Sequence, residues 1–338
     1  MNIILLSGGS GKRLWPLSND IRSKQFIKLF KDDNGNYESM VQRVYRQITT
    51  VNPMVKVTVA TSKNQVSVIK SQLGEKINIC VEPSRRDTFP AILLAAAYIH
   101  YELGIGVEEC IAVCPVDPYV DNDYYKCVGE LENLVEAGTA NLTLMGIKPT
   151  YPSDKYGYII PDCVEKTSLV QSFKEKPDVK TAEKYLERHA LWNAGVFAFK
   201  LGYLLDKAHD IVDFTDYRDL YAKYDDLPKI SFDYAVVEKE PSIQVVRYEG
   251  EWKDVGTWNM MSEVMADAAK GKAIMDNTCI NTNIVNELNL PIICMGLKNM
   301  VIAASVDGIL ISDKEASGRM KPLSLIHISE PTRQEAIS

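Results

Sequence analysis

The feature that most constrains this chain is a glycine-rich stretch close to its amino terminus. An apolar run at residues 2–6 predicts a buried strand, which leads into Ser-Gly-Gly-Ser-Gly-Lys-Arg at 7–13. Glycine has no side chain and tolerates φ > 0, so the backbone amides of such a loop can approach an anion closely. The stretch therefore predicts a phosphate-binding loop directly after the first strand.

The spacing excludes two familiar kinds of phosphate loop. A P-loop requires Gly-x-x-x-x-Gly-Lys-Ser/Thr, but Leu6 stands at the position of its first glycine and Arg13 at that of its hydroxyl residue. A dinucleotide fingerprint requires a third glycine where this chain has Leu14, and Pro16 interrupts the helix that should begin there. What remains is a glycine-rich loop with two cations, Arg13 and Lys24. A tight turn that binds nothing would leave both cations without a role.

The complete motif has a counterpart in a known family. The stretch resembles the signature of sugar-nucleotide pyrophosphorylases, Gly-Gly-x-Gly-x-Arg-Leu-x-Pro-Leu-Ser followed by Lys24. Trp15 within this motif resembles the residue found in the mannose-1-phosphate guanylyltransferase branch. The resemblance covers residues 1–322 and implies that GTP and mannose 1-phosphate give GDP-mannose and pyrophosphate. It also implies that the nucleotide binds at Leu6, Gly8, Gly9, Ser10, Gly11, Lys12 and Arg13.

Composition narrows the class of protein. The chain has 338 residues, 46% of them hydrophobic and 25% charged, which is ordinary for a soluble globular protein. A net charge of −7 argues against a general nucleic-acid binder, and no apolar run is long enough to span a bilayer. The seven cysteines form no Cys-x-x-Cys pair, so we expect reduced core thiols rather than disulfides or a zinc site. We expect a cytoplasmic protein with no nucleic-acid or membrane partner.

The first half of the chain alternates short apolar runs with amphipathic stretches. This pattern predicts a mainly parallel sheet with helices on both faces. The strands are expected at 2–6, 56–61, 77–81, 110–115 and 141–147, and the helices at 39–48, 64–73, 90–103 and 123–137. The family resemblance implies a Rossmann-like, GT-A-like α/β fold. Ligands of open α/β sheets bind beyond the carboxyl ends of the strands, so we expect the site there.

A polar segment that begins at Glu82 follows the third of these strands. Its position past a strand end suits the recognition of a base or ribose. Alternatively, Asp87 or Thr88 caps the helix that follows, and the two roles are compatible. The resemblance implies that Glu82, Arg86 and Thr88 line the base pocket, although Asp87 and Phe89 depart from the family's usual residues.

Asp117 follows the strand expected at 110–115 and is flanked by prolines. An aspartate at the carboxyl end of a parallel strand is well placed to hold a hard cation, although an Asp-Pro turn would explain the same residues. The family pattern has histidine after this aspartate, where this chain has Pro118. The resemblance further implies that Asp254, in Trp-x-Asp-Val-Gly-x-Trp, is a second ligand, so that Asp117 and Asp254 share one Mg²⁺.

The second half of the chain carries isolated motifs between shorter strands. Gly157 lies between two tyrosines, which suits the approach of a flat sugar face to the backbone. Strand alternation would put Glu175 and Lys176 on opposite sides, unless the strand ends there and Lys176 turns into the loop. The resemblance implies that Glu175 contacts sugar hydroxyls, Lys176 the sugar phosphate and Asn193 the sugar. Asp233 is implied near the sugar pocket, or it serves as a helix N-terminal carboxylate.

Short strands separated by turns follow residue 268. We therefore expect a nucleotidyltransferase domain at 1–268 and a β extension at 269–322, which the resemblance implies is the start of a left-handed β-helix-like region. Such an extension would serve packing or assembly, including a homo-oligomer. Residues 323–338 resemble the translation of a transposon-type sequencing adapter, so we expect a non-native tail and exclude it from fold reasoning.

The expected reaction is in-line attack of the sugar phosphate on the α-phosphorus of GTP. A phosphomonoester is mostly dianionic at neutral pH, so no general base is needed. Catalysis then requires positioning and charge neutralisation. The residues expected to supply these are Arg13, Lys24, Asp117 and Lys176. Two alternatives stay open: a nucleotidyltransferase for another base or sugar, such as dTTP with glucose 1-phosphate, and a non-catalytic regulatory subunit that binds a sugar nucleotide.

Overall fold

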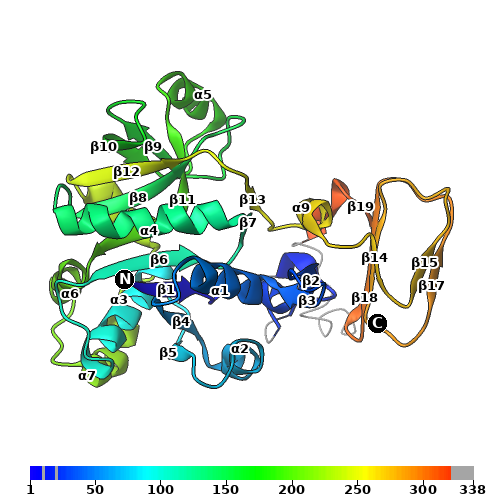
Figure 1. Cartoon of the computed structure of the whole chain (residues 1–338), viewed down its shortest axis with the longest axis horizontal. Helices are drawn as coiled ribbons and strands as arrows, with labels where there is room; N and C mark the ends of the chain where they lie inside the picture. Colours follow the sequence, from blue (N-terminus) through cyan, green and yellow to red (C-terminus); the bar gives the residue numbers. More distant parts are fainter. Residues whose placement is uncertain (10–11, 20–21, 321–338) are drawn as a thin grey trace, which may run out of the picture. The chain divides into compact units, whose positions relative to one another are not determined.

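The computed structural model describes residues 1–9, 12–19 and 22–320 (Figure 1). Ser10, Gly11 and the tail expected at 323–338 lie outside the described residues, and for Lys12 only the backbone is described. The chain forms two compact units. Unit 1 comprises residues 1–8, 45–116 and 120–252, and unit 2 comprises 9–44, 117–119 and the chain from 253 onward. These units follow a different division from the expected domains, whose boundary at 268 stays a prediction.

Unit 1 is built on a nine-stranded sheet with the order β5-β4-β1-β6-β11-β8-β12-β10-β9. The strands are β1 (Asn2–Leu6), β4 (Lys56–Ser62), β5 (Asn78–Glu82), β6 (Cys110–Pro115), β8 (Leu142–Ile147), β9 (Tyr158–Pro161), β10 (Thr167–Lys174), β11 (Leu191–Lys200) and β12 (Ile243–Tyr248). β1 pairs in parallel with β4 and β6, β4 with β5, and β8 with β12. β11 runs antiparallel to β6 and β8, and β10 runs antiparallel to β9 and β12.

Each strand expected in the first half of the chain is present, with small shifts at its ends. These strands are apolar runs that the fold buries, as in β1, where Ile3, Ile4 and Leu5 are all buried. The structure adds one arrangement that the sequence did not indicate: β11 enters the sheet between β6 and β8. The mixed α/β sheet confirms the predicted fold class.

Helices cover the sheet. The described helices are α1 (Met40–Val51), α2 (Val66–Leu73), α3 (Thr88–Ala97), α4 (Asn122–Ala137), α5 (Val179–Glu187), α6 (Leu201–His209), α7 (Tyr217–Ala222), α8 (Phe232–Ala235) and α9 (Trp258–Val264). α3 packs against β1, β4 and β5, and α4 packs against β6, β8, β11 and β12. Ile4 of β1 belongs to the core around α3, while its neighbours Ile3 and Leu5, which point to the opposite face, are also buried. Both faces of β1 are therefore covered.

Unit 2 contains a hairpin and a β extension, the segment 269–313. In the hairpin, β2 (Lys28–Lys31) runs antiparallel to β3 (Tyr37–Ser39). In the extension, β14 (Ala269–Gly271), β16 (Asn283–Asn286) and β18 (Met300–Ser305) are parallel, β19 (Gly308–Asp313) joins β18 antiparallel, and β15 (Ala273–Met275) pairs in parallel with β17 (Ile292–Cys294). Successive turns of chain thus stack around a small core of Ile284, Cys294 and Ile302. This arrangement confirms the predicted β-helix-like extension.

The cysteines follow the prediction only in part. All of them are free thiols, and five are buried, but Cys163 is exposed and Cys279 is half-buried. The prediction of core thiols is wrong for Cys163, which lies in a polar turn outside the apolar strands, whereas Cys279 packs against the small core of the β extension. Within the described ranges, none of the helices is both long and apolar enough to cross a membrane.

Candidate active site

A cluster of charged side chains in unit 2 contains four of the predicted residues. Lys24 Nζ lies 2.9 Å from Asp117 Oδ2, and the side chain of Lys24 is only 15% exposed. Burial lowers the pKa of Lys24, but the charges of Asp117 and Asp254 and the hydrogen bond to Asp117 outweigh it, so the pKa is raised above its ordinary value of 10.5. The charge of Arg13 acts on Lys24 in the opposite direction. Lys24 is therefore a fixed cation between two carboxylates.

Gly256 leaves room for the side chains of Arg13 and Asp254 beside its backbone. A Cβ at Gly256 would lie 3.3 Å from Asp254 Oδ1 and 3.5 Å from Arg13 Nη1, which is close contact on both sides. Glycine leaves this space open. The backbone after Asp254 thus lies against both an anionic and a cationic side chain of the cluster.

Pairing of two short strands brings the aspartates in from distant parts of the sequence. β7 (Pro118–Val120) pairs with β13 (Trp252–Asp254). Asp117 immediately precedes β7, and Asp254 is the last residue of β13. Lys24 begins a short 3₁₀ turn whose next two residues, Gln25 and Phe26, are buried and hold it in place.

The donor set in this cluster fits magnesium. Mg²⁺ typically keeps several waters and takes one or two carboxylates together with substrate phosphates. Asp117 and Asp254 could supply two such carboxylates. Among the residues that the structure describes, no group of three or more His, Cys, Asp or Glu side chains could enclose a metal ion alone. A cation here would therefore need oxygens from the nucleotide and water.

The predicted base-binding residues lie together in unit 1 at the carboxyl end of β5. Glu82 is buried and accepts a hydrogen bond from Tyr224 Oη at 2.9 Å, and burial raises its pKa. A Cβ at Gly8 would lie 3.2 Å from Glu82 Oε1, so the glycine loop begins in close contact with this carboxyl group. Leu6 ends β1, directly before the loop.

Arg86 and Thr88 have structural partners in unit 1. Arg86 donates from Nε to Asp225 Oδ1 at 3.0 Å and from Nη1 to the Leu227 carbonyl at 2.8 Å. Thr88 Oγ1 accepts from the Phe232 amide at 2.9 Å. The helix-capping alternative also holds, because Asp87 is the N-cap of α3. The contribution of Arg86 and Thr88 to base binding stays a prediction.

The predicted sugar-binding residues form a second cluster in unit 1. The side chain of Asn193 donates from Nδ2 to Asp233 Oδ1 at 2.6 Å, and its backbone N–H donates to the Gly157 carbonyl at 2.8 Å. A Cβ at Gly157 would stand 2.5 Å from Glu175 Oε2 and 2.9 Å from Phe173 Cζ. Gly157 is therefore required for the close approach of these side chains.

Lys176 turns away from the strand, which decides between the two arrangements left open by the sequence. β10 ends at Lys174, and Lys176 has φ +44, in the left-handed region. Its ammonium forms an ion pair with the buried carboxylate of Glu175. Burial lowers the pKa of Lys176, while the bond to Glu175 and the charge of Asp233 outweigh this and raise it. Glu175, Lys176 and Asp233 thus form one electrostatically linked group.

Comparison with known proteins identifies the family. The nucleotidyl transferase family matches residues 2–271, which is most of the chain. The chain belongs to this family. A mannose-1-phosphate guanylyltransferase of Escherichia coli is 30% identical over 363 residues, covering 98% of this chain and 76% of that protein. The xanthan biosynthesis protein XanB of Xanthomonas campestris pv. campestris (strain B100) is 29% identical over 98% of this chain and 74% of its own length.

A solved structure extends this likeness to the fold. A protein from Thermus thermophilus, described as a mannose-1-phosphate geranyltransferase, matches with a TM-score of 0.78 at 26% identity. The match covers 96% of this chain and 98% of that one. These comparisons confirm the family and fold inferred from the sequence. The roles of individual residues in this nucleotidyl transferase stay predictions.

Asp233→Asn should flatten the dependence of stability on pH. Burial and the charge of Glu175 raise the pKa of Asp233 from 3.8 to about 7, so between these values the folded state retains a proton that the unfolded chain has released. The free energy of unfolding should therefore fall as pH rises through this range, by at most about 1.4 kcal/mol per pH unit. Urea unfolding between about pH 4 and pH 7 should show this slope in the wild type and a smaller one in Asp233→Asn.

Asp178 provides the matched control for this titration. It is the exposed N-cap of α5, and hydrogen bonds from Thr181 hold its pKa below 3.8. Asp178→Asn should leave the slope between about pH 4 and pH 7 unchanged, because its own titration lies below that range. The same slope in Asp233→Asn as in the wild type would contradict the raised pKa of Asp233.

The sequence missed the partners that hold the site residues. Tyr224 contacts Glu82 and Asp225 contacts Arg86 from far along the chain, and neither lies in a recognisable motif. Gly256 belongs to the motif around Asp254, but nothing in that motif indicates its contact with Arg13. Only the folded chain reveals such non-local contacts.

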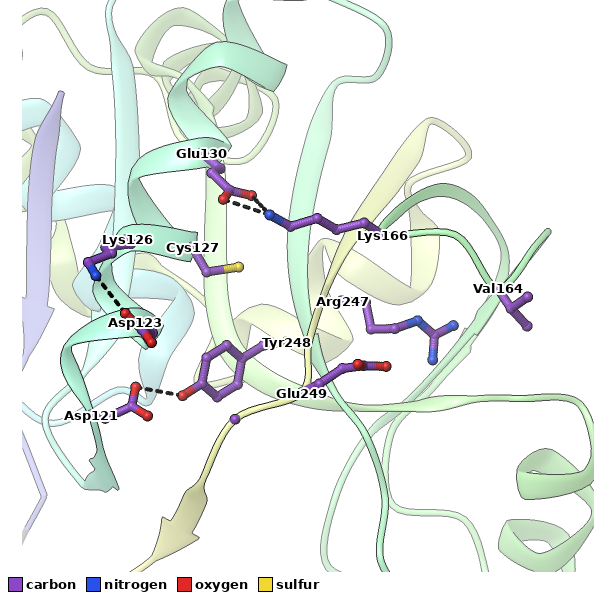
Figure 2. Close-up of a pocket in the computed structure, with 11 residues that line it drawn as sticks. Asp121, Asp123, Lys126, Cys127, Glu130, Val164, Lys166, Arg247, Tyr248 and Glu249 are labelled. Atoms are coloured by element: carbon purple, nitrogen blue, oxygen red, sulfur yellow. Dashed lines mark hydrogen bonds and ion pairs between the residues drawn. The ribbon is translucent and has the colours of Figure 1, made fainter.

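A separate cavity of about 570 Å³ lies in unit 1 and is shown in Figure 2. It is lined by Asp121, Asp123, Lys126, Cys127, Glu130, Val164, Lys166, Arg247, Tyr248, Glu249 and Gly250. Lys126 pairs with Asp123 at 2.7 Å and Lys166 with Glu130 at 2.6 Å, so neighbouring carboxylates balance both lysine charges. None of the predicted site residues lines this cavity, and it has no part in the proposed reaction.

Proposed function

We propose that this chain makes GDP-mannose and pyrophosphate from GTP and mannose 1-phosphate. The observation that carries the proposal is the cluster in unit 2. Lys24 Nζ lies 2.9 Å from Asp117 Oδ2, and the charges of Asp254 and Arg13 both act on the pKa of Lys24. Two cations and two acidic groups are what a site for a triphosphate with a divalent ion requires. The relatives named mannose-1-phosphate guanylyltransferase support the choice of base and sugar.

The reaction would proceed by displacement at the α-phosphorus. A phosphate oxygen of mannose 1-phosphate forms a bond to the α-phosphorus of GTP, and the bond from that phosphorus to the bridging oxygen breaks, so pyrophosphate leaves. The attacking phosphate is already mostly dianionic at neutral pH, so no side chain has to remove a proton. The protein must instead hold two polyanions against their mutual repulsion.

Each group of residues would have a distinct task. Arg13 and Lys24 would bind the triphosphate together with the amides of the glycine loop, and Lys176 would hold the attacking phosphate. Asp117 and Asp254 would hold Mg²⁺, which when bound supplies positive charge to the phosphates. Glu175, Asn193 and Asp233 would bind the sugar, and Glu82, Arg86 and Thr88 would line the base pocket.

Pyrophosphate release across a panel of substrates tests the proposal. GTP, dTTP, UTP and CTP are each combined with mannose 1-phosphate and with glucose 1-phosphate. We expect GTP with mannose 1-phosphate to give a kcat/KM at least about 100-fold above the other pairs, because a site that hydrogen-bonds its substrate strongly rejects analogues lacking the matching groups. Highest turnover with dTTP and glucose 1-phosphate would contradict the proposed substrates and assign the chain to a different base and sugar. Binding of GDP-mannose without turnover of any pair would indicate a regulatory subunit.

A further inference from the structure

Helix α9 and the β extension are both hydrogen-bonded to the chain that follows Arg13, within unit 2. Trp258 Nε1 donates to the Trp15 carbonyl at 3.0 Å, and Ser305 Oγ donates to the Pro16 carbonyl at 2.7 Å. Trp258 belongs to α9 and Ser305 ends β18, and both side chains are buried. Two consecutive carbonyls of the segment are thus held by groups that lie more than 240 residues away in the sequence.

Gly308 supplies a third contact, through its lack of a side chain. A Cβ at Gly308 would stand 2.5 Å from Trp15 Cζ2 and 2.7 Å from Trp15 Cη2. The φ of Gly308 is +144, a conformation that residues with side chains rarely adopt. The turn between β18 and β19 therefore brings bare backbone against the Trp15 ring, which no larger residue would allow.

Two further polar contacts hold Asn19 and Arg22. Asn19 Nδ2 donates to Asp307 Oδ2 at 2.9 Å. Arg22 donates to both oxygens of Glu287, at 2.6 and 2.8 Å. A paired arrangement of this kind restricts orientation as well as distance. The β extension thus holds the chain at Trp15, Pro16, Asn19 and Arg22, which all lie between Arg13 and Lys24.

Such support matters because the segment carries two charged residues at its ends. Groups that stabilise a transition state electrostatically must be held within a fraction of an ångström, and an unsupported loop loses conformational entropy each time it adopts that geometry. We propose that Ser305, Gly308 and Glu287 of the β extension are positioning residues for Arg13 and Lys24, so that nucleotide binding depends on the extension. This inference rests on the proposed function of that loop as the triphosphate site.

Ser305→Ala tests the inference most directly, because it removes the hydroxyl that donates to the Pro16 carbonyl and accepts from the Asp307 amide at 3.1 Å. We expect the KM for GTP to rise about 10-fold, because the segment loses the hydrogen bond at Pro16, while the KM for mannose 1-phosphate stays within about 2-fold. Glu287→Gln should shift the same two constants in the same directions. Ser312→Ala is the matched control, since Ser312 Oγ bonds to the carbonyl of Asp313 within β19. It should leave both constants unchanged.

Hydrogen exchange provides a readout that does not depend on turnover. The amides of Leu17 and Ser18 both donate to the Leu14 carbonyl, so their exchange reports the order of the segment. We expect exchange about 10-fold faster in Ser305→Ala than in the wild type or Ser312→Ala. Unchanged exchange, or a rise in both KM values by the same factor, would overturn the inference. A wild-type chain that turns over no substrate pair would instead overturn the proposed function, and exchange would then decide this inference separately.

Discussion

Asp117→Asn should fold like the wild type and lose turnover by about 10²–10³, the usual effect of removing one charge-stabilising group from a transition state. The side chain keeps its shape but loses the charge that lies 2.9 Å from Lys24 Nζ. The carboxylate is 44% exposed, so the loss of its ion pair should have little effect on stability. Pyrophosphate release gives kcat, and thermal unfolding in the same buffer gives Tm.

Asp123→Asn is the control for Asp117→Asn. Asp123 also carries an ion pair, with Lys126 at 2.7 Å, but it lies in unit 1 on the exposed side of α4. Its amide variant should retain the wild-type rate within about 2-fold, because exposed ion pairs contribute little. If Asp117→Asn retained a similar rate while both variants stayed folded, Asp117 could not be a metal ligand.

The expected loss combines two effects that can be separated. Without the carboxylate of Asp117, Mg²⁺ would have one fewer charged ligand, and Lys24 would lose the partner that supports its raised pKa. Weaker metal binding can be overcome by more Mg²⁺, whereas a change at Lys24 cannot. A titration with Mg²⁺ should therefore restore part of the rate if the metal contribution dominates.

Much of the fold could be predicted because its first half depends on local pattern. β1, β4 and β6 are short apolar runs, which predict buried strands. The amphipathic stretches between them predict parallel pairing with helical crossovers. The insertion of β11 between β6 and β8 could not be predicted in this way. It depends on pairing between segments that are far apart in the sequence, for which alternation within one strand carries no information.

The same contrast holds for the candidate site. Arg13, Lys24 and Asp117 were found because each belongs to a recognisable motif or strand end. The contacts that hold the chain between Arg13 and Lys24 could not be predicted. Gly308 lies against the Trp15 ring, but the two are almost 300 residues apart and no sequence pattern connects them. The turn at Lys176 lies between these cases. The sequence left two arrangements open, and the end of β10 decided between them.

The backbone conformation of Lys176 favours glycine as the substitution that removes its ammonium. Its φ of +44 is strained for a residue with a side chain, so glycine fits this position better than lysine does. Lys176→Gly therefore removes the ammonium and relieves the backbone of the turn. It also removes the ion-pair partner of the buried Glu175 carboxylate, which lowers stability, so Tm is measured alongside the rate.

Lys176→Gly should raise the KM for mannose 1-phosphate and lower kcat/KM by about 10²–10³, while the KM for GTP stays within about 2-fold. Lys176→Arg should recover part of the rate, since it keeps the charge. Lys174→Ala is the control, because Lys174 is an exposed lysine at the end of the same strand that pairs with Glu238 at 3.2 Å. If Lys174→Ala and Lys176→Gly reduced kcat/KM equally, the effect would be one of general surface charge, and Lys176 would not contact the attacking phosphate.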